Sequence, residues 1–448
     1  MPDLNTFPQV KKELDAVGCG FCLAKWTQVT THLGSGITHS CHHVGAHKIP
    51  LDELATNPGA LHNTNFKKQI RKEMLAGKRP DECDYCWRIE DNTNNFSDRI
   101  TKSSEQWSTI DKDKIIASTG DENVYPRYAE ISFSNVCNFK CSYCGPAFSS
   151  KWTEEIKTNG PYKLKNNHYN SIKDTEVPIL EREENPYIEA FWKWFPEAVK
   201  HMQVFRITGG EPLLSKHTNR VIQYLINNPQ PDLEFAINSN ACPPDGIWKN
   251  FVNSIKKLEA SGSIKSFSLF TSAESVNEQA EYSRDGMDWD VFNKNIKYFL
   301  ENTNDINICF MSAFNIFSLP TIHKYVCHIE KLKRDYSDRI HMDFAYVRHP
   351  EFLDIKIATK EMIELYLKST ITYMRNEKNK RFKIEEIIKL ERIYNDCIAR
   401  FKKNTNVDAD RFRFVQFVNE YDRRRNKNFL KTFPEYKEFY KLCENSNV

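Results

Sequence analysis

Six short runs of the chain combine apolar and β-branched residues in the pattern of buried strands, and segments with helical periodicity separate them. The runs cover residues 129–133, 204–208, 233–238, 266–271, 307–313 and 341–347. After the first run they recur at intervals of roughly 25–40 residues, which is typical of repeated βα units. The pattern therefore predicts an α/β fold with a parallel sheet.

The segment before these runs has a different pattern. Polar and apolar residues alternate over 27–33, Gly34-Ser35-Gly36 forms a turn signal, and a second alternating run reaches Cys41. A helix is expected over 65–77, because Gly77 is a typical C-terminal stop. A β-hairpin followed by a helix predicts a small α+β module.

The pattern divides the chain into four parts. We expect a cysteine-rich module at 1–100, a polar linker at 101–123, the βα units at 124–350, and a cluster of amphipathic helices at 351–448. An insertion at about 151–186 follows the first strand, and it is either a lid over the site or a surface excursion. The basic run at 422–427 is by default a solvated helix face, with contact to a phosphate or an acidic peptide as the alternative.

Composition narrows the class of protein. The 448 residues carry a net charge of +3, well interspersed, which argues against a strong polyanion-binding surface and makes nucleic acid an unexpected partner. No run approaches the ~18 apolar residues of a membrane span, and no signal peptide is predicted at the N-terminus. The 13 cysteines are partly grouped in short arrays, which favours metal ligation in a reducing cytoplasm over disulfides.

The most informative group follows the first predicted strand. Cys137, Cys141 and Cys144 form a C-x3-C-x2-C array on a tight loop. Thiolates are preferred ligands of iron–sulfur clusters and of zinc. A structural zinc ion takes four protein ligands, whereas three cysteines suit a [4Fe–4S] cluster with one iron left for a ligand that is not protein. Three ligands of a zinc site remain the alternative.

This array, with Tyr143 before the last cysteine, resembles the radical S-adenosylmethionine (SAM) superfamily. The resemblance implies a partial (β/α)6 TIM-like barrel. It also implies that the open iron chelates SAM and that one electron cleaves the sulfonium, giving a 5′-deoxyadenosyl radical that abstracts hydrogen from a substrate. In this reading Tyr143 packs near the adenine.

The same resemblance assigns further SAM contacts just after later strands, where the chemistry of such barrels lies. Gly209, Gly210 and Glu211 match the family's GGEP turn at the SAM amino group. The remaining candidates are Asn238 and Ser239, Ser268 and Ser272, Arg284 for the SAM carboxylate, and Asn315. An Asn-rich turn is the alternative for 238–240, and Arg284 could equally pair with a surface carboxylate.

The N-terminal module offers a second set of thiols, Cys22, Cys41, Cys83 and Cys86. Their order resembles the SPASM/twitch extension of radical SAM enzymes, which implies an auxiliary [4Fe–4S] cluster. The family usually carries this extension after the barrel, whereas here it precedes it. Cys19 is a rival for Cys22, and a four-thiolate zinc site is a rival for the cluster. The nearby histidines at 39, 42, 43 and 47 are expected mostly to face solvent or to hydrogen-bond.

Together these features predict a radical SAM oxidoreductase with two [4Fe–4S] clusters. The resemblance points first to a peptide or protein side chain as substrate, and second to a sugar, nucleoside or other small metabolite. A flavodoxin- or ferredoxin-type reductant is the expected partner. An alternative of a different class is a non-catalytic zinc or iron–sulfur protein that uses the barrel as a binding module.

Overall fold

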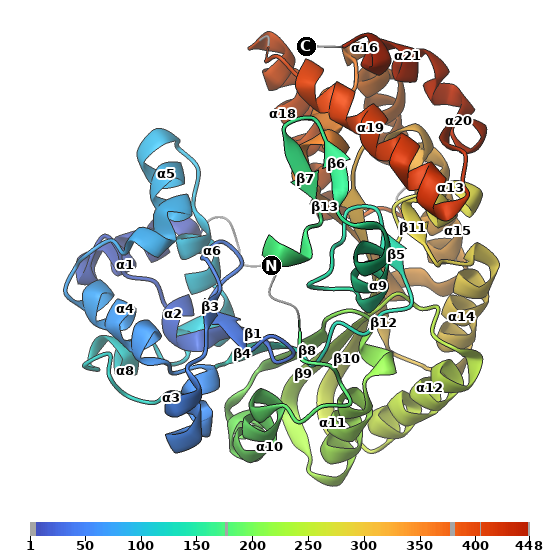
Figure 1. Ribbon diagram of the computed structural model, residues 1–448. Helices are drawn as coiled ribbons and strands as arrows, with labels where there is room; N and C mark the ends of the chain where they lie inside the picture. The colour runs from blue at the N-terminus through green and yellow to red at the C-terminus, as the bar shows by residue number, and fades with distance from the viewer. Residues whose placement is uncertain (1–5, 175–177, 377–380, 404, 447–448) are drawn as a thin grey trace. The chain divides into compact units, whose positions relative to one another are not determined.

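The structure is a computed structural model that describes residues 6–174, 178–376, 381–403 and 405–446. The chain forms two compact units (Figure 1). The first unit contains Met1–Ser134, Pro178–Ile237 and Lys257–Phe267; the second contains Asn135–Val177, Asn238–Lys256 and Ser268–Val448. Each unit is described separately.

The first unit is built on a mixed sheet. Its strands are β1 (Gln28–His32), β2 (Ile37–His39), β3 (His47–Lys48), β4 (Tyr128–Ser132), β8 (Val204–Thr208) and the first part of β9 (Gln230–Ser239). β4 lies between β1 and β8 and is parallel to both, and β8 is parallel to β9. β1, β2 and β3 pair antiparallel. The predicted N-terminal hairpin is therefore present, and it extends the sheet that contains β4.

Helices cover this sheet and fill the N-terminal segment. They are α1 (Phe7–Val17), α2 (Ala24–Thr27), α3 (Leu51–Thr56), α4 (Asn65–Leu75), α5 (Asp84–Asn92), α6 (Asp98–Ser103), α7 (Gln106–Thr109), α8 (Lys112–Ile116), α10 (Pro186–Ala198) and α11 (Lys216–Asn227). The predicted helix at 65–77 is confirmed as α4. The Thr64 side chain accepts a hydrogen bond from Lys67 N at its start.

The second unit contains a parallel sheet made by the end of β10 (Ile264–Thr271), β12 (Asn307–Phe314) and β13 (Ile340–Tyr346). Two small antiparallel pairs accompany it, β5 (Lys140–Cys141) with β11 (Arg284–Asp285) and β6 (Tyr162–Leu164) with β7 (Asn167–Tyr169). Its helices include α9 (Ser150–Asn159), α13 (Asn277–Ser283), α14 (Trp289–Asn302) and α15 (Ile322–Tyr336). α12 (Asp245–Ala260) contributes residues to both units.

The last hundred residues are helical, as predicted. They form α16 (Lys360–Met362), a π-helical turn at Ile363–Lys368, α17 (Ser369–Arg375), α18 (Ile384–Lys402), α19 (Asp408–Arg425), α20 (Phe429–Thr432) and α21 (Lys437–Asn445). An aromatic cluster that includes Phe414, Phe429 and Phe433 holds α19 and α20 together by edge and tilted ring contacts. The basic run at the end of α19 is not a solvated face throughout: the side chains of Arg424 and Arg425 are 2% and 1% exposed.

All six predicted strands are confirmed, as β4, β8, β9, β10, β12 and β13. The protein is thus a mixed α/β protein with an extensive parallel sheet, while closure into a partial barrel and the four domain boundaries stay predictions. The insertion at 151–186 contains most of α9 and the β6–β7 pair, and its residues 175–177 lie outside the described part of the chain. Within the described residues, no helix is both long and apolar enough to cross a bilayer.

Candidate functional site

The three-cysteine loop lies in the second unit and is fixed mainly through its backbone. Trp152 Nε1 donates to Cys141 O at 2.9 Å, and Ser142 N donates to Ser283 O at 2.8 Å. Tyr169 Oη donates to both Ser142 O and Cys144 O, at 2.9 and 3.0 Å. Neutral hydrogen bonds therefore anchor most of the carbonyls of this loop.

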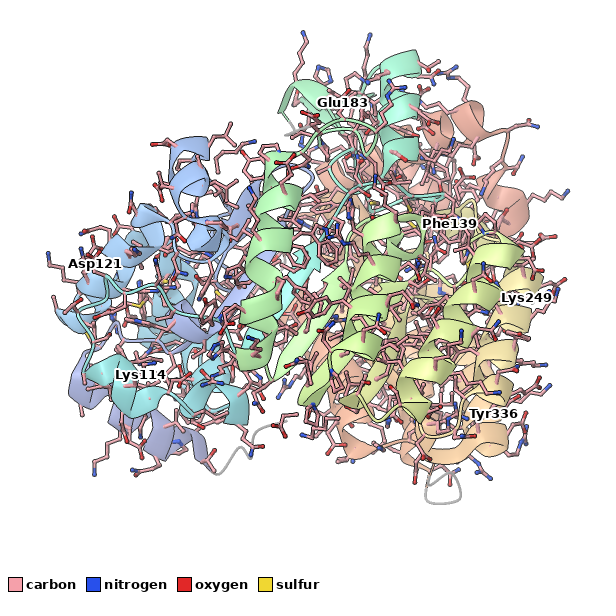
Figure 2. The ribbon with its side chains drawn as sticks, turned by 90° about the horizontal axis from the view of Figure 1, so that it is seen from below. Lys114, Asp121, Phe139, Glu183, Lys249 and Tyr336 are labelled. Atoms are coloured by element: carbon pink, nitrogen blue, oxygen red, sulfur yellow. The ribbon has the colours of Figure 1, made fainter. Side chains whose placement is uncertain are left out.

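The thiols of this loop are partly buried. Burial raises the pKa of Cys141, and burial followed by the negative charge of Cys141 raises the pKa of Cys144 to about 12. The two sulfurs are therefore close enough to interact. Cys137 Sγ accepts a hydrogen bond from Phe139 N at 3.4 Å, and Phe139 itself is buried in the second unit (Figure 2). A thiolate-binding metal would have to displace protons here.

An ionic cluster lies against Cys141. Arg284 is 5% exposed; its Nε donates to Glu274 Oε2 at 2.9 Å and its Nη1 lies 3.8 Å from Cys141 Sγ. Tyr143 Oη donates to Glu274 Oε1 at 3.1 Å. The structure thus brings together two of the predicted residues, Tyr143 and Arg284, with the buried Glu274. The roles assigned to them toward SAM stay predictions.

Two asparagines connect the cysteine loop to the tip that follows β9. Asn240 Nδ2 donates to Asn138 Oδ1 at 2.8 Å, and Asn138 Nδ2 donates to Cys242 O at 2.7 Å. Asn240 belongs to the polar tip at 238–240 for which SAM contacts are predicted, whereas Asn138 was not among the predicted site residues. The position of Asn138 between the first two cysteines was the available signal. Of the predicted neighbours, Ser239 is buried and its Oγ accepts from Ala241 N at 3.1 Å. The side chain of Asn238 is half-buried.

The predicted GGEP turn follows β8 in the first unit. Gly209 has a φ of +130°, and a Cβ there would lie 2.7 Å from Ser132 Oγ and 2.8 Å from Ser134 O. Gly210 N donates to Ser134 O at 3.3 Å. Glycine is therefore required sterically, because the turn lies directly against the chain that leaves β4. Glu211 is 1% exposed and accepts from Leu213 N at 3.0 Å.

The remaining predicted contacts lie in the second unit. Ser268 and Ser272 are half-buried, at positions that alternate with the buried Leu269 and Thr271. Asn315 is fully buried; its Oδ1 accepts from Phe317 N at 2.9 Å and its Nδ2 donates to Ala313 O at 2.7 Å. The amide of Asn315 is thus engaged in holding the turn after β12.

The four N-terminal thiols converge in the first unit. Cys22, Cys41, Cys83 and Cys86 all line one cavity of about 20 Å³ within the hydrophobic cluster formed by this segment. Cys19 does not line this cavity; it is exposed, and its thiol lies 3.7 Å from Gly77 O. The structure therefore groups Cys22, rather than its rival, with the other three.

Burial and the neighbouring thiols raise the pKa values of this group. Burial raises the pKa of Cys22 to about 12, with further contributions from the charges of Cys41 and Cys86. Burial also raises the pKa of Cys83 and of Cys86, while the Arg99 backbone N–H acts in the opposite direction on Cys86. N–H donors to sulfur of this kind are typical second-sphere partners of thiolate-bound metals.

Cations and carboxylates both lie at the same cavity. Lys25, Arg99, Lys102 and Asp98 line it, and the two buried cations are paired, Lys25 with Glu82 and Arg99 with Glu90 and Asp15. A centre with four thiolates carries net negative charge whether it holds a divalent zinc or a [4Fe–4S]²⁺ core, so both fit this environment and charge does not separate them.

Histidines near Cys41 are mostly occupied by other contacts. His39 Nδ1 lies 2.7 Å from Cys41 O, and burial lowers its pKa to about 4. His43 also lines the cavity; its ring stacks on Tyr85 at 3.6 Å and its Nε2 lies 2.9 Å from Asp98 Oδ2. These contacts agree with the expectation that the histidines hydrogen-bond.

Across residues 6–174, 178–376, 381–403 and 405–446, no three or more His, Cys, Asp or Glu side chains are arranged in the geometry of a metal site. The four N-terminal cysteines nevertheless fit a metal centre by their number, their burial and the cavity that they share. For the three-cysteine loop the fit rests on spacing and on the neighbouring Cys141 and Cys144 thiols.

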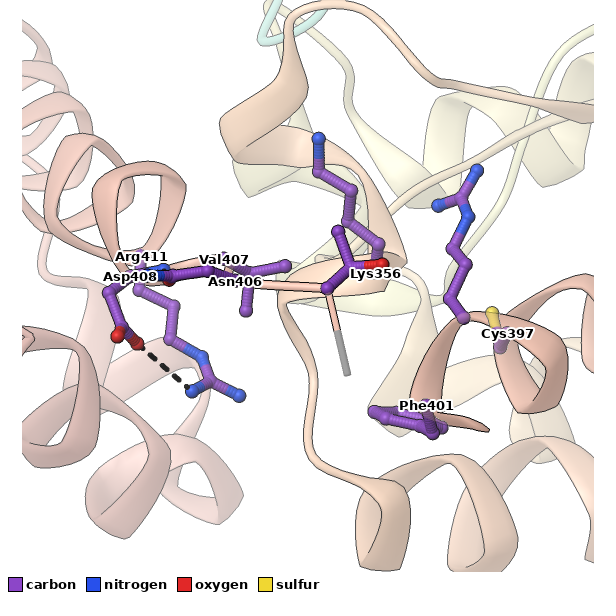
Figure 3. Close-up of a pocket in the computed structure, with 9 residues that line it drawn as sticks. Lys356, Cys397, Phe401, Asn406, Val407, Asp408 and Arg411 are labelled. Atoms are coloured by element: carbon purple, nitrogen blue, oxygen red, sulfur yellow. Dashed lines mark hydrogen bonds and ion pairs between the residues drawn. The ribbon is translucent and has the colours of Figure 1, made fainter. Parts of the chain in front are cut away.

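A separate cavity of about 410 Å³ lies among the C-terminal helices (Figure 3). Three cations line it, but each is paired with a carboxylate: Arg411 with Asp408, Lys356 with Asp410, and Arg400 with Asp354. The cavity therefore has no excess positive charge to attract an anion.

No protein-family model matches the chain, and no curated protein is significantly similar to it. Among solved structures, the chain is similar to Streptococcus suis SuiB bound to precursor peptide SuiA, with 15% identity over 78% of this chain and 69% of that chain and a TM-score of 0.35. It is also similar to SuiB bound to S-adenosylmethionine, with 15% identity, 76% of each chain covered and a TM-score of 0.31. TM-scores of this size do not establish a shared fold or a shared activity.

Proposed function

We propose that this protein is a radical SAM enzyme. The observation that carries the proposal is the C-x3-C-x2-C loop directly after β4, whose Cys141 lies beside Cys144 and against the Arg284 guanidinium. A [4Fe–4S] cluster bound there would supply one electron to the sulfonium of SAM, giving methionine and a 5′-deoxyadenosyl radical that takes a hydrogen atom from the substrate.

The chain's own residues hold and orient the participants. Cys137, Cys141 and Cys144 bind the cluster. Gly209 and Gly210 bring backbone close to the methionine end of SAM, and the Glu211 carboxylate accepts from its ammonium. Arg284 faces the SAM carboxylate and, together with Glu274, keeps water out of the space beside Cys141. Tyr143 packs near the adenine, and Asn238, Ser239, Ser268, Ser272 and Asn315 supply further contacts.

The N-terminal thiols bind an auxiliary [4Fe–4S] cluster. Because Cys22, Cys41, Cys83 and Cys86 would ligate all four irons, such a cluster would relay electrons to or from the substrate and would leave no iron open to the substrate itself. The alternative at this site is structural zinc, which the same four thiols would accept.

The resemblance to enzymes with SPASM or twitch extensions favours a peptide or protein side chain as the substrate. A sugar, nucleoside or other small metabolite is the second candidate, and a flavodoxin or ferredoxin is the expected reductant. The alternative of a different class is a non-catalytic zinc or iron–sulfur binding module, and the GGEP turn directly after β8 speaks against it.

The test is anaerobic reconstitution followed by iron and sulfide analysis and an assay for 5′-deoxyadenosine with dithionite. The triple variant with Cys137, Cys141 and Cys144 changed to Ala should lose SAM cleavage but keep the iron of the second site. The matched control changes Cys309 and Cys327 to Ala, which removes thiols outside both groups and should leave cleavage and iron content unchanged. Zinc at both sites with no cleavage would establish the binding module instead.

A further inference from the structure

The end of helix α19 lies against the three-cysteine loop. Arg425 Nη1 donates to Lys140 O at 2.7 Å, which is the carbonyl of the peptide bond that leads into Cys141. Arg425 Nε donates to Glu155 Oε2 at 3.1 Å. A residue some 280 positions further along the chain thus contacts the loop directly at the residue before its second cysteine.

The surroundings of Arg425 explain how a guanidinium can be 1% exposed. Its Cζ lies 3.8 Å from the Tyr421 ring centre and 4.6 Å from that of Trp152, and Asp285 lies 3.9 Å away. Two carboxylates and two aromatic faces replace the hydration that burial removes. A planar cation with several donors fits this site, and a lysine ammonium cannot reproduce all of these contacts.

Glu155 links this cation to the loop a second time. It accepts from Lys140 Nζ at 2.9 Å and from Tyr162 Oη at 2.7 Å. Burial acts to raise the pKa of Glu155, but the charge of Arg425 and these hydrogen bonds outweigh it and hold the pKa below its ordinary value. The carboxylate is therefore ionised and links the Lys140 side chain to Arg425 on α19, while Arg425 itself binds the Lys140 carbonyl.

The aromatic layer completes the connection. Trp152, on which Arg425 stacks, donates from Nε1 to Cys141 O at 2.9 Å. Arg425 thus binds the carbonyl before Cys141, and its stacking partner Trp152 binds the carbonyl of Cys141 itself. On the other side, β11 pairs with β5 so that Arg284 lies opposite Cys141.

We propose that Arg425 is a positioning residue of the three-cysteine loop, which makes the C-terminal helix α19 part of the SAM-cleaving site. The proposal deepens the proposed function, and the expected effect of Arg425 on the reduction potential rests on that function. The positioning of the loop by Arg425 does not depend on it. Arg425 orients the 140–141 peptide and places positive charge near the Cys141 sulfur. This charge would favour the reduced form of an iron–sulfur cluster bound by the loop.

The test compares three variants in the full-length protein, before and after anaerobic reconstitution. Arg425→Gln removes both the positive charge and the planar set of guanidinium donors. Arg425→Lys keeps the charge but lacks those donors. Arg423→Gln is the matched control, since this neighbour on α19 is 62% exposed and pairs with Glu420. The measurements are hydrogen exchange of the amides at 138–142, with β12 and β13 as internal reference, and the reduction potential of the iron bound by the loop.

For Arg425→Gln we expect roughly tenfold faster exchange at 138–142 with unchanged β12 and β13, as loss of a charge-assisted hydrogen bond predicts. Its reduction potential should shift downward, while Arg425→Lys keeps a potential near that of the parent. If Arg425→Gln also accelerates hydrogen exchange in β12 and β13, that variant is destabilised as a whole and Arg425→Lys becomes the test. For Arg425→Lys we expect faster exchange at 138–142 only. Exchange equal to that of Arg423→Gln would overturn the positioning role, whereas absence of iron in the parent protein would overturn the proposed function alone.

Discussion

Two cysteines that are three positions apart in the N-terminal segment have different surroundings. Sequence spacing left Cys19 and Cys22 as alternatives, because Cys19-Gly20-Phe21-Cys22 is itself a C-x2-C pair. Packing separates them: Cys22 lines the cavity shared by the other three thiols, and Cys19 is exposed beside Gly77. The difference depends on where the fold places Cys41 after β2, Cys83 in the turn before α5 and Cys86 on α5, which local sequence does not encode.

This difference gives a prediction with a built-in control. Cys22→Ser should lose most of the metal bound by the N-terminal site, because a serine hydroxyl is a poor replacement for a soft thiolate. Cys19→Ser should retain it. Metal analysis and visible absorption after reconstitution measure both, in the background of the triple Ala change at 137, 141 and 144. Equal loss in the two variants would mean that Cys19 also ligates.

At the scale of single elements, regular strands were predictable and their partners were not. The apolar and β-branched runs identified β4, β8 and β12 within a residue or two. The parallel pairing of β1 with β4, by contrast, joins residues a hundred positions apart, and nothing in either strand specifies it. The candidate site behaves in the same way. The spacing of the cysteines identifies them in the sequence, whereas Glu274, Asn240 and Arg425 come close to the loop only in the folded chain.

In helix α4 the sequence pattern does not reveal which charged side chains are buried. Its sequence reads as a basic amphipathic helix, yet Lys67 and Arg71 are 1% and 0% exposed. Lys67 Nζ donates to Thr38 Oγ1 at 2.8 Å, and no carboxylate lies within ion-pair distance of it among the described residues. Burial, followed by the charges of Arg71 and Lys25, lowers the pKa of Lys67 well below 10.5.

A pH dependence follows for α4. Between the lowered pKa and 10.5 the unfolded chain binds more protons than the folded chain, so the folded state gains stability as pH rises through this window. Lys67→Met removes the penalty and should raise the free energy of unfolding by about 1–3 kcal/mol near pH 7, and by less near pH 9.5. The matched control, Lys68→Met on the same helix, should show no such pH-dependent gain. Chemical denaturation at both pH values measures this, and a gain that is independent of pH would contradict it.

At the scale of the whole molecule, each compact unit contains one of the two thiol groups. The first unit holds Cys22, Cys41, Cys83 and Cys86, and the second holds the loop at 137–144. The two groups differ in how far the fold depends on them. Hydrogen bonds from Trp152 and Tyr169 hold the carbonyls of the loop. The N-terminal thiols come from three separate places in their segment, because Cys83 and Cys86 form one C-x2-C pair.

Metal removal should therefore destabilise the first unit selectively. A metal held by four thiolates closes the segment from Cys22 to Cys86, so its loss removes a crosslink from the hydrophobic cluster of this segment. In small zinc domains thiolate-bound metal supplies on the order of 10 kcal/mol, so even a fraction of that would expose these elements. In the background of the triple Ala change at 137, 141 and 144, chelation should accelerate hydrogen exchange in α4 and α5 while β12 and β13 keep their protection. Uniform acceleration in both units, or none in α4 and α5, would show that the N-terminal thiols do not hold a structural centre.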